Sequence, residues 1–332
     1  MKKTFATALL ATATISACQT TNPQAHECEI ATWKNFATAA VSYTFDDNLP
    51  NQFSIAAPML EQYGFVGSFY PIVGDVDNWD VLSHYTDMGH EIGSHTYNHL
   101  PLSSLNADSL QFELQKSKEI IKQNVPSTDC LTLVYPYCDK PDTAAVAQHY
   151  IAARICDCKI EPATPANYYA ISSFGIGSES AQYKTAESVI GIFDNAKQQG
   201  GWCVILVHEI EDGYGYSPFP TAALDSTLHF LADNQPDFWV DTFGNVAKYT
   251  KERDNANISL IECNNEYLWL SLTSPLNSEV YNVPLSIRRP LPKNWTDVVV
   301  KQNNTDIDFC INNGYIYFNA IPNAGDITIQ HL

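Results

Sequence analysis

A regular alternation of short apolar runs with helix-like stretches across residues 41–253 is the feature that most constrains the fold of this chain. The apolar runs are rich in β-branched and aromatic residues, as strands are, and such alternation favours a parallel sheet. A series of this length favours a (β/α) barrel, so we expect an α/β domain here. The strand-like runs are 41–45, 67–72, 91–95, 131–137, 150–155, 169–174, 202–207 and 238–240, and the helix-like stretches are 53–63, 107–123, 143–148, 186–198 and 221–232.

The pattern of apolar and polar residues changes after Arg253. Residues 254–332 contain no helix-like stretch, and their alternating segments are separated by Asn, Pro and Gly turns. We expect a small all-β module, like a β-sandwich, after the barrel. Its aromatic residues are expected to fill its core, and a carbohydrate-binding role is the alternative.

Residues 1–18 have the layout of a secretory signal, with two lysines, an apolar run too short to span a bilayer, and small residues before Cys18. The segment ISAC resembles a bacterial lipobox, in which the cysteine is lipidated and becomes the new N-terminus. Gln19 follows it, which by the rule for such lipoproteins favours the outer membrane. We expect an exported protein anchored by a lipid on Cys18, with residues 19–40 as a tether leading into the barrel. An ordinary cleaved signal is the alternative.

The charge of the chain limits its partners. It has 18 basic and 37 acidic residues, and removal of the signal takes away two lysines, which leaves 16 − 37 = −21. A surface this acidic repels nucleic acid and anionic polymers, so we expect no nucleic-acid partner and a neutral or cationic glycan as substrate. Solubility alone is an equally good explanation of the charge.

Nine cysteines are present, and eight remain when Cys18 is set aside. An exported protein favours disulfides, but eight cysteines allow about 105 pairings. Cys263 and Cys310 are the only cysteines in the β-module, and we expect them to pair because so small a module buries little core. Cys156 and Cys158 form a possible soft metal site, which we disfavour because no second thiol pair accompanies them.

Ionisable residues gather where the strand-like runs end. Asp46 and Asp47 end the first run, His95 ends the third, and His208 follows the seventh. Barrel enzymes place their active sites at these strand ends. We therefore expect these side chains to meet in one site.

The segment SHTYNH contains His95 and His99, which share one face if the chain turns helical after His95. A catalytic zinc ion takes three N or O ligands and an open position for water. Asp46 or Asp47 can supply the third ligand. Two adjacent carboxylates are costly unless a cation lies between them or one is protonated, so one is expected to bind the metal and the other to act on the water.

The combination of TFDD at 44–47, SHTYNH at 94–99, YPY at 135–137 and LVH at 206–208 resembles the NodB-like polysaccharide deacetylases of carbohydrate esterase family four. The resemblance covers roughly residues 41–253 and implies an incomplete (β/α) barrel. It implies one divalent metal ion, usually zinc. It also implies that Asp46 is the general base, that Asp47, His95 and His99 bind the metal, that the Tyr137 N–H stabilises the oxyanion, that His208 is the general acid, and that Leu206 and Tyr135 contact the substrate.

One position departs from the family pattern. The family has an arginine two residues before the proline of the YPY segment, and it orients the catalytic aspartate; this chain has Val134. We expect Arg154, near the end of the next strand, to replace it in a bidentate pair with Asp46. The alternative is an Arg154 that points outward into a surface ion pair.

Three functions remain open from the sequence. The resemblance implies hydrolysis of acetyl groups from a glycan, either an N-acetylhexosamine polymer or oligomer such as chitin, or O-acetyl xylan. A catalytically inactive glycan-binding lipoprotein is the first alternative, and Val134 is its only support. A metal-dependent amidase acting on a small amide is the second. The sequence does not indicate an oligomeric state.

Overall fold

The computed structural model describes residues 28–213 and 215–332, so the expected signal and Cys18 lie outside the described residues. The described chain divides into two compact units. A barrel unit comprises residues 30–256 and 274–286, and a β unit comprises residues 28–29, 257–273 and 287–332.

Strand β2 (Ala39–Asp46) is the central strand of the barrel, and all its residues are buried. Because both faces are buried, its residues are either apolar or hydrogen-bonded inside the barrel, as the hydroxyls of Ser42 and Thr44 are. Parallel partners flank it on both sides. Its neighbours are β3 (Ser68–Tyr70) and then β4 (Glu91–Ile92) on one side, and β8 (Trp202–Val207) and then β7 (Phe174–Gly175) on the other, while β9 (Phe238–Val240) pairs with its first half.

Strands β5 (Thr132–Val134) and β6 (Ala152–Arg154) form a separate two-stranded parallel sheet. Single bridges join this pair to the rest of the ring, from Ser94 to Leu133 on one side and from Arg154 to Ile171 on the other. The ring therefore closes through isolated contacts and not through continuous ladders. This is the expected incomplete (β/α) barrel, and that prediction is confirmed.

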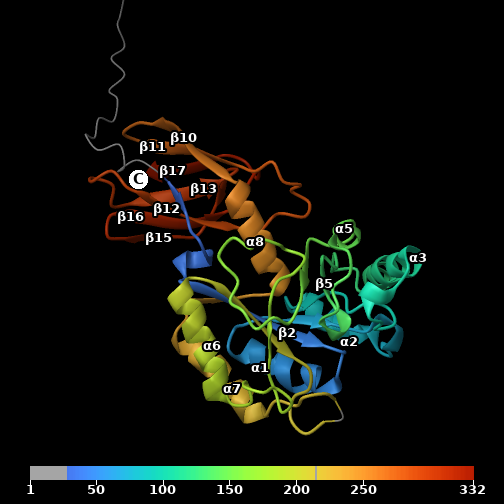
Figure 1. Ribbon diagram of the computed structural model, residues 1–332. Coiled ribbons are helices and arrows are strands. Elements are labelled where there is room, and N and C mark those ends of the chain that lie inside the picture. The colour runs from blue at the N-terminus through green and yellow to red at the C-terminus, as the bar shows by residue number, and fades with distance from the viewer. Residues whose placement is uncertain (1–27, 214) are drawn as a thin grey trace, which may run out of the picture. The chain divides into compact units, whose positions relative to one another are not determined.

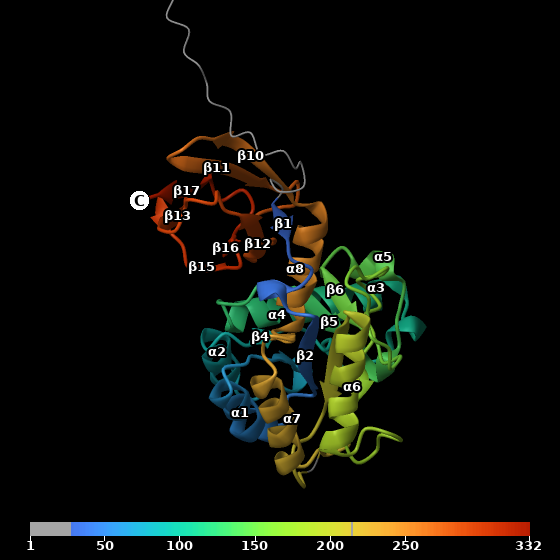
Figure 2. The same cartoon turned by 90° about the vertical axis from the view of Figure 1, so that its left-hand side faces the viewer.

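Helices surround the strands on the outside of the barrel, where Figures 1 and 2 both place α6 beside α7. Each expected helix is present, and α2 and α8 lie outside the stretches that the sequence indicated. In the part of the chain that the structure describes, no helix is long and apolar enough to cross a lipid bilayer. The helices are η3 (Gln52–Ala56), α1 (Ala57–Gln62), α2 (Trp79–Asp87), α3 (Ala107–Gln111), η6 (Phe112–Lys116), α4 (Ser117–Asn124), α5 (Thr143–Val146), α6 (Ala186–Gln199), α7 (Thr221–Asp233) and α8 (Phe243–Asn255).

Helix α6 has sequence signals for its beginning and its end. The Thr185 hydroxyl accepts the Ser188 N–H and the Ser188 hydroxyl accepts the Thr185 N–H, which forms a capping box. Gly200 ends the helix at φ 62°, a left-handed conformation that glycine adopts without a Cβ clash. The apolar face between these ends is buried and contributes about 1.5–3 kcal/mol per large side chain; it consists of Val189, Ile192, Phe193 and Ala196.

Glu252 on α8 is a fully buried acid. Its Oε2 accepts the Val283 N–H at 2.9 Å, and its Oε1 has no hydrogen-bond partner among the described residues. Burial raises the pKa of Glu252 to about 7 from its ordinary value of 4.5. The folded state therefore binds this proton more tightly than the unfolded state does. The raised pKa of Glu252 adds to the free energy of unfolding. This addition has its full value below pH 4.5 and is lost as the pH rises through 7.

We expect Glu252→Gln to be more stable than the wild type at pH 8, by about 1–3 kcal/mol, because the amide needs no proton to stay neutral. Thermal unfolding between pH 5 and pH 8 measures this effect. The gap between the two melting temperatures should widen with pH. A gap that stays constant over this range would contradict the assignment.

The strands of the β unit form two sheets, as expected for an all-β module, and β1 and β12 each also include residues of the barrel unit. In β11 alternate residues Leu268, Leu270 and Leu272 are buried, which is the period of a strand with one face in a core. One sheet contains β10 (Asn257–Cys263), β11 (Tyr267–Thr273), β17 (Ile327–His331), β13 (Val298–Gln302) and β14 (Thr305–Asp306), and the other contains β1 (Glu29–Ile30), β12 (Leu285–Pro290), β16 (Tyr315–Ala320) and β15 (Phe309–Asn312).

The expected pairing of Cys263 with Cys310 is wrong. The two residues lie on strands of different sheets, β10 and β15, and the Cys310 thiol is free. Among the described residues, a disulfide joins Cys138 to Cys156 in the barrel. This bond also removes Cys156 from the disfavoured soft metal site.

Candidate active site

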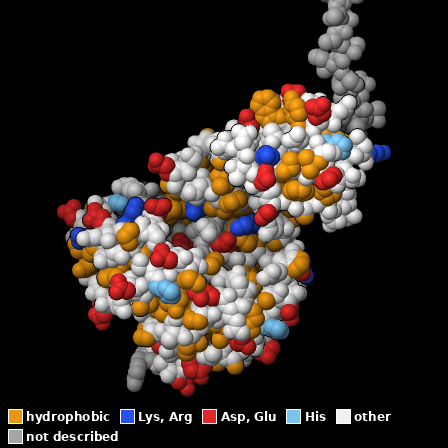
Figure 3. Space-filling view, turned by 180° about the vertical axis from the view of Figure 1, so that it is seen from behind, with side chains coloured by type: hydrophobic (Ala, Val, Ile, Leu, Met, Phe, Trp, Pro, Cys, Tyr) orange, Lys and Arg blue, Asp and Glu red, His pale blue; other side chains and the backbone are white. Residues whose placement is uncertain are grey.

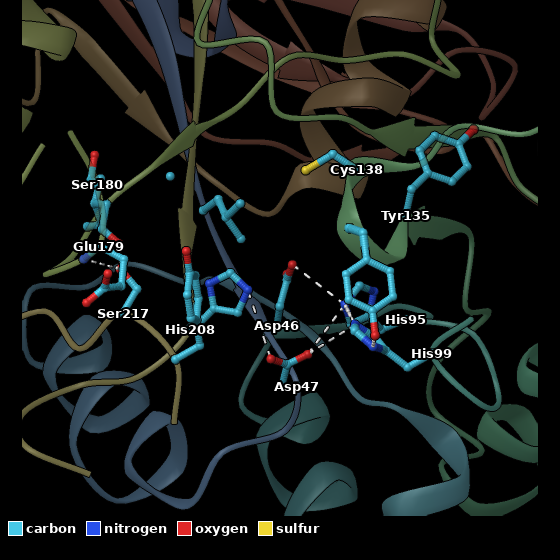
Figure 4. Close-up of a pocket in the computed structure, with 15 residues that line it drawn as sticks. Asp46, Asp47, His95, His99, Tyr135, Cys138, Glu179, Ser180, His208 and Ser217 are labelled. Carbon is cyan, nitrogen blue, oxygen red and sulfur yellow. Dashed lines mark hydrogen bonds and ion pairs between the residues drawn. The ribbon is translucent and has the colours of Figure 1, made fainter. Parts of the chain in front are cut away.

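A cavity of about 700 Å³ opens at the carboxyl ends of the barrel strands, and Figure 4 shows its lining. Asp46 and Asp47 lie in its centre, His95 and His99 on one side, and His208 on the other. The lining also includes every residue predicted to contact substrate or oxyanion. Its remaining members are Tyr135, Tyr137, Cys138, Gly175, Ile176, Glu179, Ser180, Leu206, Tyr216 and Ser217.

Three side chains direct donor atoms at one point. Asp47 Oδ1 lies 3.4 Å from His95 Nε2 and 3.7 Å from His99 Nε2, and the two Nε2 atoms are 3.1 Å apart. Metal–ligand bonds of about 2.0–2.1 Å in a tetrahedron require ligand atoms about 3.3–3.4 Å apart. Asp47 Oδ1 is also buried and accepts no hydrogen bond from the described residues. The three residues therefore fit a tetrahedral divalent ion with one open position.

The pKa shifts of Asp47 and His99 also suit metal binding. Burial raises the pKa of Asp47, but His95, His208 and His99 together outweigh it, so the pKa is lowered overall. Burial, and then His95, lower the pKa of His99. A carboxylate and neutral imidazoles are the forms that bind a metal ion.

The two histidines do not meet through a helix. Residues 95–100 form a loop in which Thr96 and His99 have positive φ values of 66° and 54°, so the expected helical turn is wrong. Local hydrogen bonds hold this loop: the Thr96 N–H donates to Ser94 Oγ, and the His99 N–H donates to Thr96 Oγ1, both at 3.1 Å. Polar side chains thus replace the helical hydrogen bonds and still bring both imidazoles to one point.

Glu113 on η6 fixes the same loop from outside. Its buried carboxylate accepts the N–H groups of Tyr97 and Asn98 at 2.9 and 2.8 Å and the Asn98 side-chain amide at 2.6 Å. The sequence analysis did not identify Glu113, because nothing in its helix-like stretch marks one acid as buried. Its role is to hold the segment between the two histidines.

Each imidazole has a second partner that orients it. His95 Nδ1 donates to the Val134 carbonyl at 2.9 Å, which leaves Nε2 free to bind a metal. His99 Nδ1 lies 3.2 Å from the Tyr137 hydroxyl, and the two rings meet edge to face. A partner on Nδ1 fixes the ring and its tautomer.

Arg154 contacts Asp46 from inside the barrel. Its Nη2 lies 2.6 Å from Asp46 Oδ2 and its Nη1 donates to Thr44 Oγ1 at 3.0 Å, and both charged side chains are buried. Arg154 is the direct register partner of Val134 across β5 and β6. The guanidinium therefore comes from the strand adjacent to the position where the family has its arginine. Asp46 Oδ1 has no partner among the described residues and is free to accept a proton.

His208 lies across the cavity, with Nε2 3.9 Å from Asp47 Oδ2. Burial lowers the pKa of His208, while Asp46 and Asp47 oppose that effect. The side-chain amide of Gln52, which is fully buried, donates to the backbone carbonyls of both Asp46 and His208. Gln52 therefore fixes the ends of β2 and β8 relative to each other. It was not predicted from the sequence, because a polar residue just before the helix-like stretch 53–63 is expected to be exposed.

The walls of the cavity combine apolar and aromatic groups. Leu206 contributes an apolar wall, and Tyr135 is buried with its hydroxyl donated to the Tyr169 carbonyl at 3.0 Å. Two aromatic rings are exposed at the rim: Tyr137 is 68% exposed, and Tyr216, which packs edge-on against His208, is 60% exposed. The sequence analysis missed Tyr216 because it follows a strand in a turn-rich segment without periodicity.

Comparisons with known proteins agree with this geometry. Residues 34–153 match the family model described as polysaccharide deacetylase. A gellan lyase of a Bacillus species is 28% identical over 336 residues, which is 92% of this chain but only 13% of that protein. A chitin deacetylase of Arthroderma benhamiae is 30% identical over 137 residues, which is 38% of this chain and 36% of that enzyme. The chain thus spans a minor part of each of these two relatives.

A solved structure gives the same fold. A Mycobacterium smegmatis protein assigned to the polysaccharide deacetylases superposes with a TM-score of 0.53 at 17% identity, covering 68% of this chain and 94% of that one. At this identity the likeness concerns the fold alone. The barrel therefore has the polysaccharide deacetylase fold, and the segment 34–153, which carries Asp47, His95 and His99, matches the sequence of that family.

Proposed function

We propose that this protein is a metal-dependent hydrolase that removes acetyl groups from a glycan. One observation carries the proposal: Asp47, His95 and His99 direct three donor atoms at one point, and the free Oδ1 of Asp46 lies in the same cavity. A metal triad beside a separate base is what hydrolysis of an amide or ester requires. Zinc is the ion that this donor set suits best.

Asp47, His95 and His99 would hold the ion, which when bound supplies a water of lowered pKa and a positive charge beside the acetyl carbonyl. Asp46 accepts the proton of the attacking water at Oδ1, while Arg154 holds Oδ2. The Tyr137 N–H donates to the oxygen that becomes negative as the carbonyl carbon turns tetrahedral. His208 gives a proton to the departing nitrogen or oxygen, and the acetyl group leaves as acetate.

The substrate class follows from the walls and the charge. Leu206 and Ile176 provide an apolar pocket of the kind that accepts an acetyl methyl, and the exposed rings of Tyr137 and Tyr216 suit the faces of sugar rings. Acidic side chains are spread over the surface in Figure 3, which disfavours a polyanionic substrate. An N-acetylhexosamine polymer or oligomer meets these conditions best, and O-acetyl xylan is the second candidate.

The contact between Arg154 and Asp46 favours an active enzyme over a glycan-binding protein that has lost catalysis. Val134 was the only support for that alternative, and Arg154 supplies the missing cation from the adjacent strand. We also propose that the protein is exported and held at the outer membrane by a lipid on Cys18. Mass analysis of the native N-terminus tests the lipid independently.

Acetate release from a panel of chitin oligosaccharides, acetylated xylan and small amides, measured together with metal content, tests the function. We expect one divalent ion per chain and release from an acetylated glycan that stops on chelation and returns with zinc. Release from small amides alone would favour the amidase. Binding to glycans without any acetate release would favour the inactive binder.

A further inference from the structure

The disulfide between Cys138 and Cys156 lies in the wall of the candidate active site. Cys138 lines the cavity, and Figure 4 shows its sulfur on the wall above Asp46. The two cysteines are 18 residues apart in the sequence, and their Cα atoms are 5.8 Å apart. The bond therefore joins two loops that leave adjacent strands of the barrel.

Each of these loops begins with a residue that the proposed reaction uses. Cys138 directly follows Tyr137 in the turn η7 (Pro136–Cys138), after β5. Cys156 comes two residues after Arg154, the last residue of β6. One covalent bond thus fixes the loop that presents the Tyr137 N–H relative to the loop that follows the Arg154 guanidinium.

The backbone at Tyr137 needs such support. Tyr137 and Cys138 both have positive φ values, 57° and 56°, and the left-handed region costs a non-glycine residue about 1–2 kcal/mol. Little packing compensates for this cost, because the Tyr137 side chain is 68% exposed. Among the described residues, the turn is also held by hydrogen bonds from the Cys138 and Asp139 N–H groups to the Tyr135 and Pro136 carbonyls and by one from the Ser103 N–H to Asp139 Oδ2. The Tyr137 side chain itself contacts His99.

The strands that carry the two loops have short ladders. β5 and β6 have three buried residues each, and among the described residues a single bridge on either side continues their pairing into the rest of the ring. A small displacement of this pair would move Tyr137 and Arg154 away from Asp46. A misplacement of about 1 Å in an active site can lower the rate by as much as about 100-fold.

We propose that the Cys138–Cys156 disulfide is a positioning element of the active site, which holds Tyr137 and Arg154 in register with Asp46. This inference rests on the proposed deacetylase function. It predicts a lower kcat at saturating metal when the bond is absent. The metal ligands themselves lie outside these two loops, so a saturated site should still hold one ion per chain, although the contacts of Val134 with His95 and of Tyr137 with His99 should weaken and lower the metal affinity. KM should change less than kcat, since Tyr137 donates to the reacting carbonyl and Arg154 acts through the base Asp46.

The first test is the Cys138→Ser/Cys156→Ser double variant, with Cys158→Ser as the matched control. Cys158 lies two residues beyond Cys156 in the same loop, is exposed, and has a free thiol. We expect the double variant to lose about 10–100-fold in kcat at one metal ion per chain, and the control to keep its full kcat. A double variant within twofold of the wild type overturns the proposal.

The second test uses the folded wild type and so does not depend on the folding of the double variant. A phosphine reductant is added, which lacks a thiol that would compete for the metal, and metal content and acetate release are measured before reduction, after it, and after reoxidation. We expect kcat to fall and return while the metal stays bound, and the double variant to be insensitive. Full activity with a reduced bond, verified by thiol counting, overturns the proposal. An oxidised wild type that binds metal but releases no acetate from any glycan overturns the proposed function, and this proposal with it.

Discussion

The His95→Ala variant is expected to lose most of its bound metal and nearly all acetate release together, and His99→Ala is expected to behave in the same way. Each substitution removes one of three converging donors and leaves the ion with two. Loss of a contact that merely orients a ligand typically lowers affinity or activity by about 10–100-fold, so loss of a ligand itself should exceed that. Metal content after dialysis and acetate release, measured on the same preparation, test both effects.

His229→Ala is the matched control for these variants. His229 is an exposed histidine of α7 that faces Asp233 and takes no part in the cavity. It should keep both metal and activity. Full metal occupancy in both the His95 and His99 variants would overturn the metal assignment.

The order of the strands and helices was predictable because each barrel strand is an apolar run between helical stretches. Helix α6 shows how far local signals reach, since its expected range of 186–198 differs from Ala186–Gln199 by one residue. Its capping residues and its terminal glycine lie at the two ends of the helix in the sequence, so the sequence itself marks where the helix begins and ends. The expected metal ligands are likewise brought together by strand ends, which topology alone places on one face of a barrel.

The residues that sequence reasoning missed act across long separations. Gln52 joins the carbonyls of Asp46 and His208, which is 156 positions away, and no local pattern indicates that contact. Glu113 holds the loop between the two histidines although its helix carries other acids that are exposed. The helical turn expected after His95 was wrong for a related reason. The side chains of Ser94, Thr96 and Glu113 accept hydrogen bonds from backbone N–H groups and so stabilise a loop, which spacing alone does not distinguish from a helix.

Arg154 could be predicted because Val134 stands where the family has an arginine beside the catalytic aspartate. A catalytic aspartate benefits from a neighbouring cation, Val134 cannot supply one, and the next strand offers an arginine at its end. The structure places that arginine 2.6 Å from Asp46 and in register with Val134. The contact with Asp46 runs through Nη2 alone, because Nη1 donates to Thr44 Oγ1, so the expected bidentate geometry is wrong.

The Arg154→Met variant is expected to lose about 10²–10⁴-fold in kcat while it keeps its metal, because Asp46 loses the partner that holds its carboxylate in place to act as base. Asp46→Asn should give the same result, whereas Asp47→Asn should lower metal content. If the two aspartate variants behaved in the opposite way, the labels of base and ligand would have to be exchanged.

Removing one partner of a buried ion pair also costs about 3–5 kcal/mol of stability, so loss of folding must be separated from loss of catalysis. Arg154→Lys serves this purpose, since it keeps the charge and loses the planar guanidinium that contacts both Asp46 and Thr44. We expect it to fold with a kcat between those of Arg154→Met and the wild type. The double exchange Val134→Arg/Arg154→Val returns a guanidinium to the same level of the sheet from the adjacent strand, and we expect it to recover part of the rate that Arg154→Met loses. A folded, metal-loaded Arg154→Met with near-normal kcat would show that Asp46 needs no cation, and the pair would then be only a structural contact of the barrel.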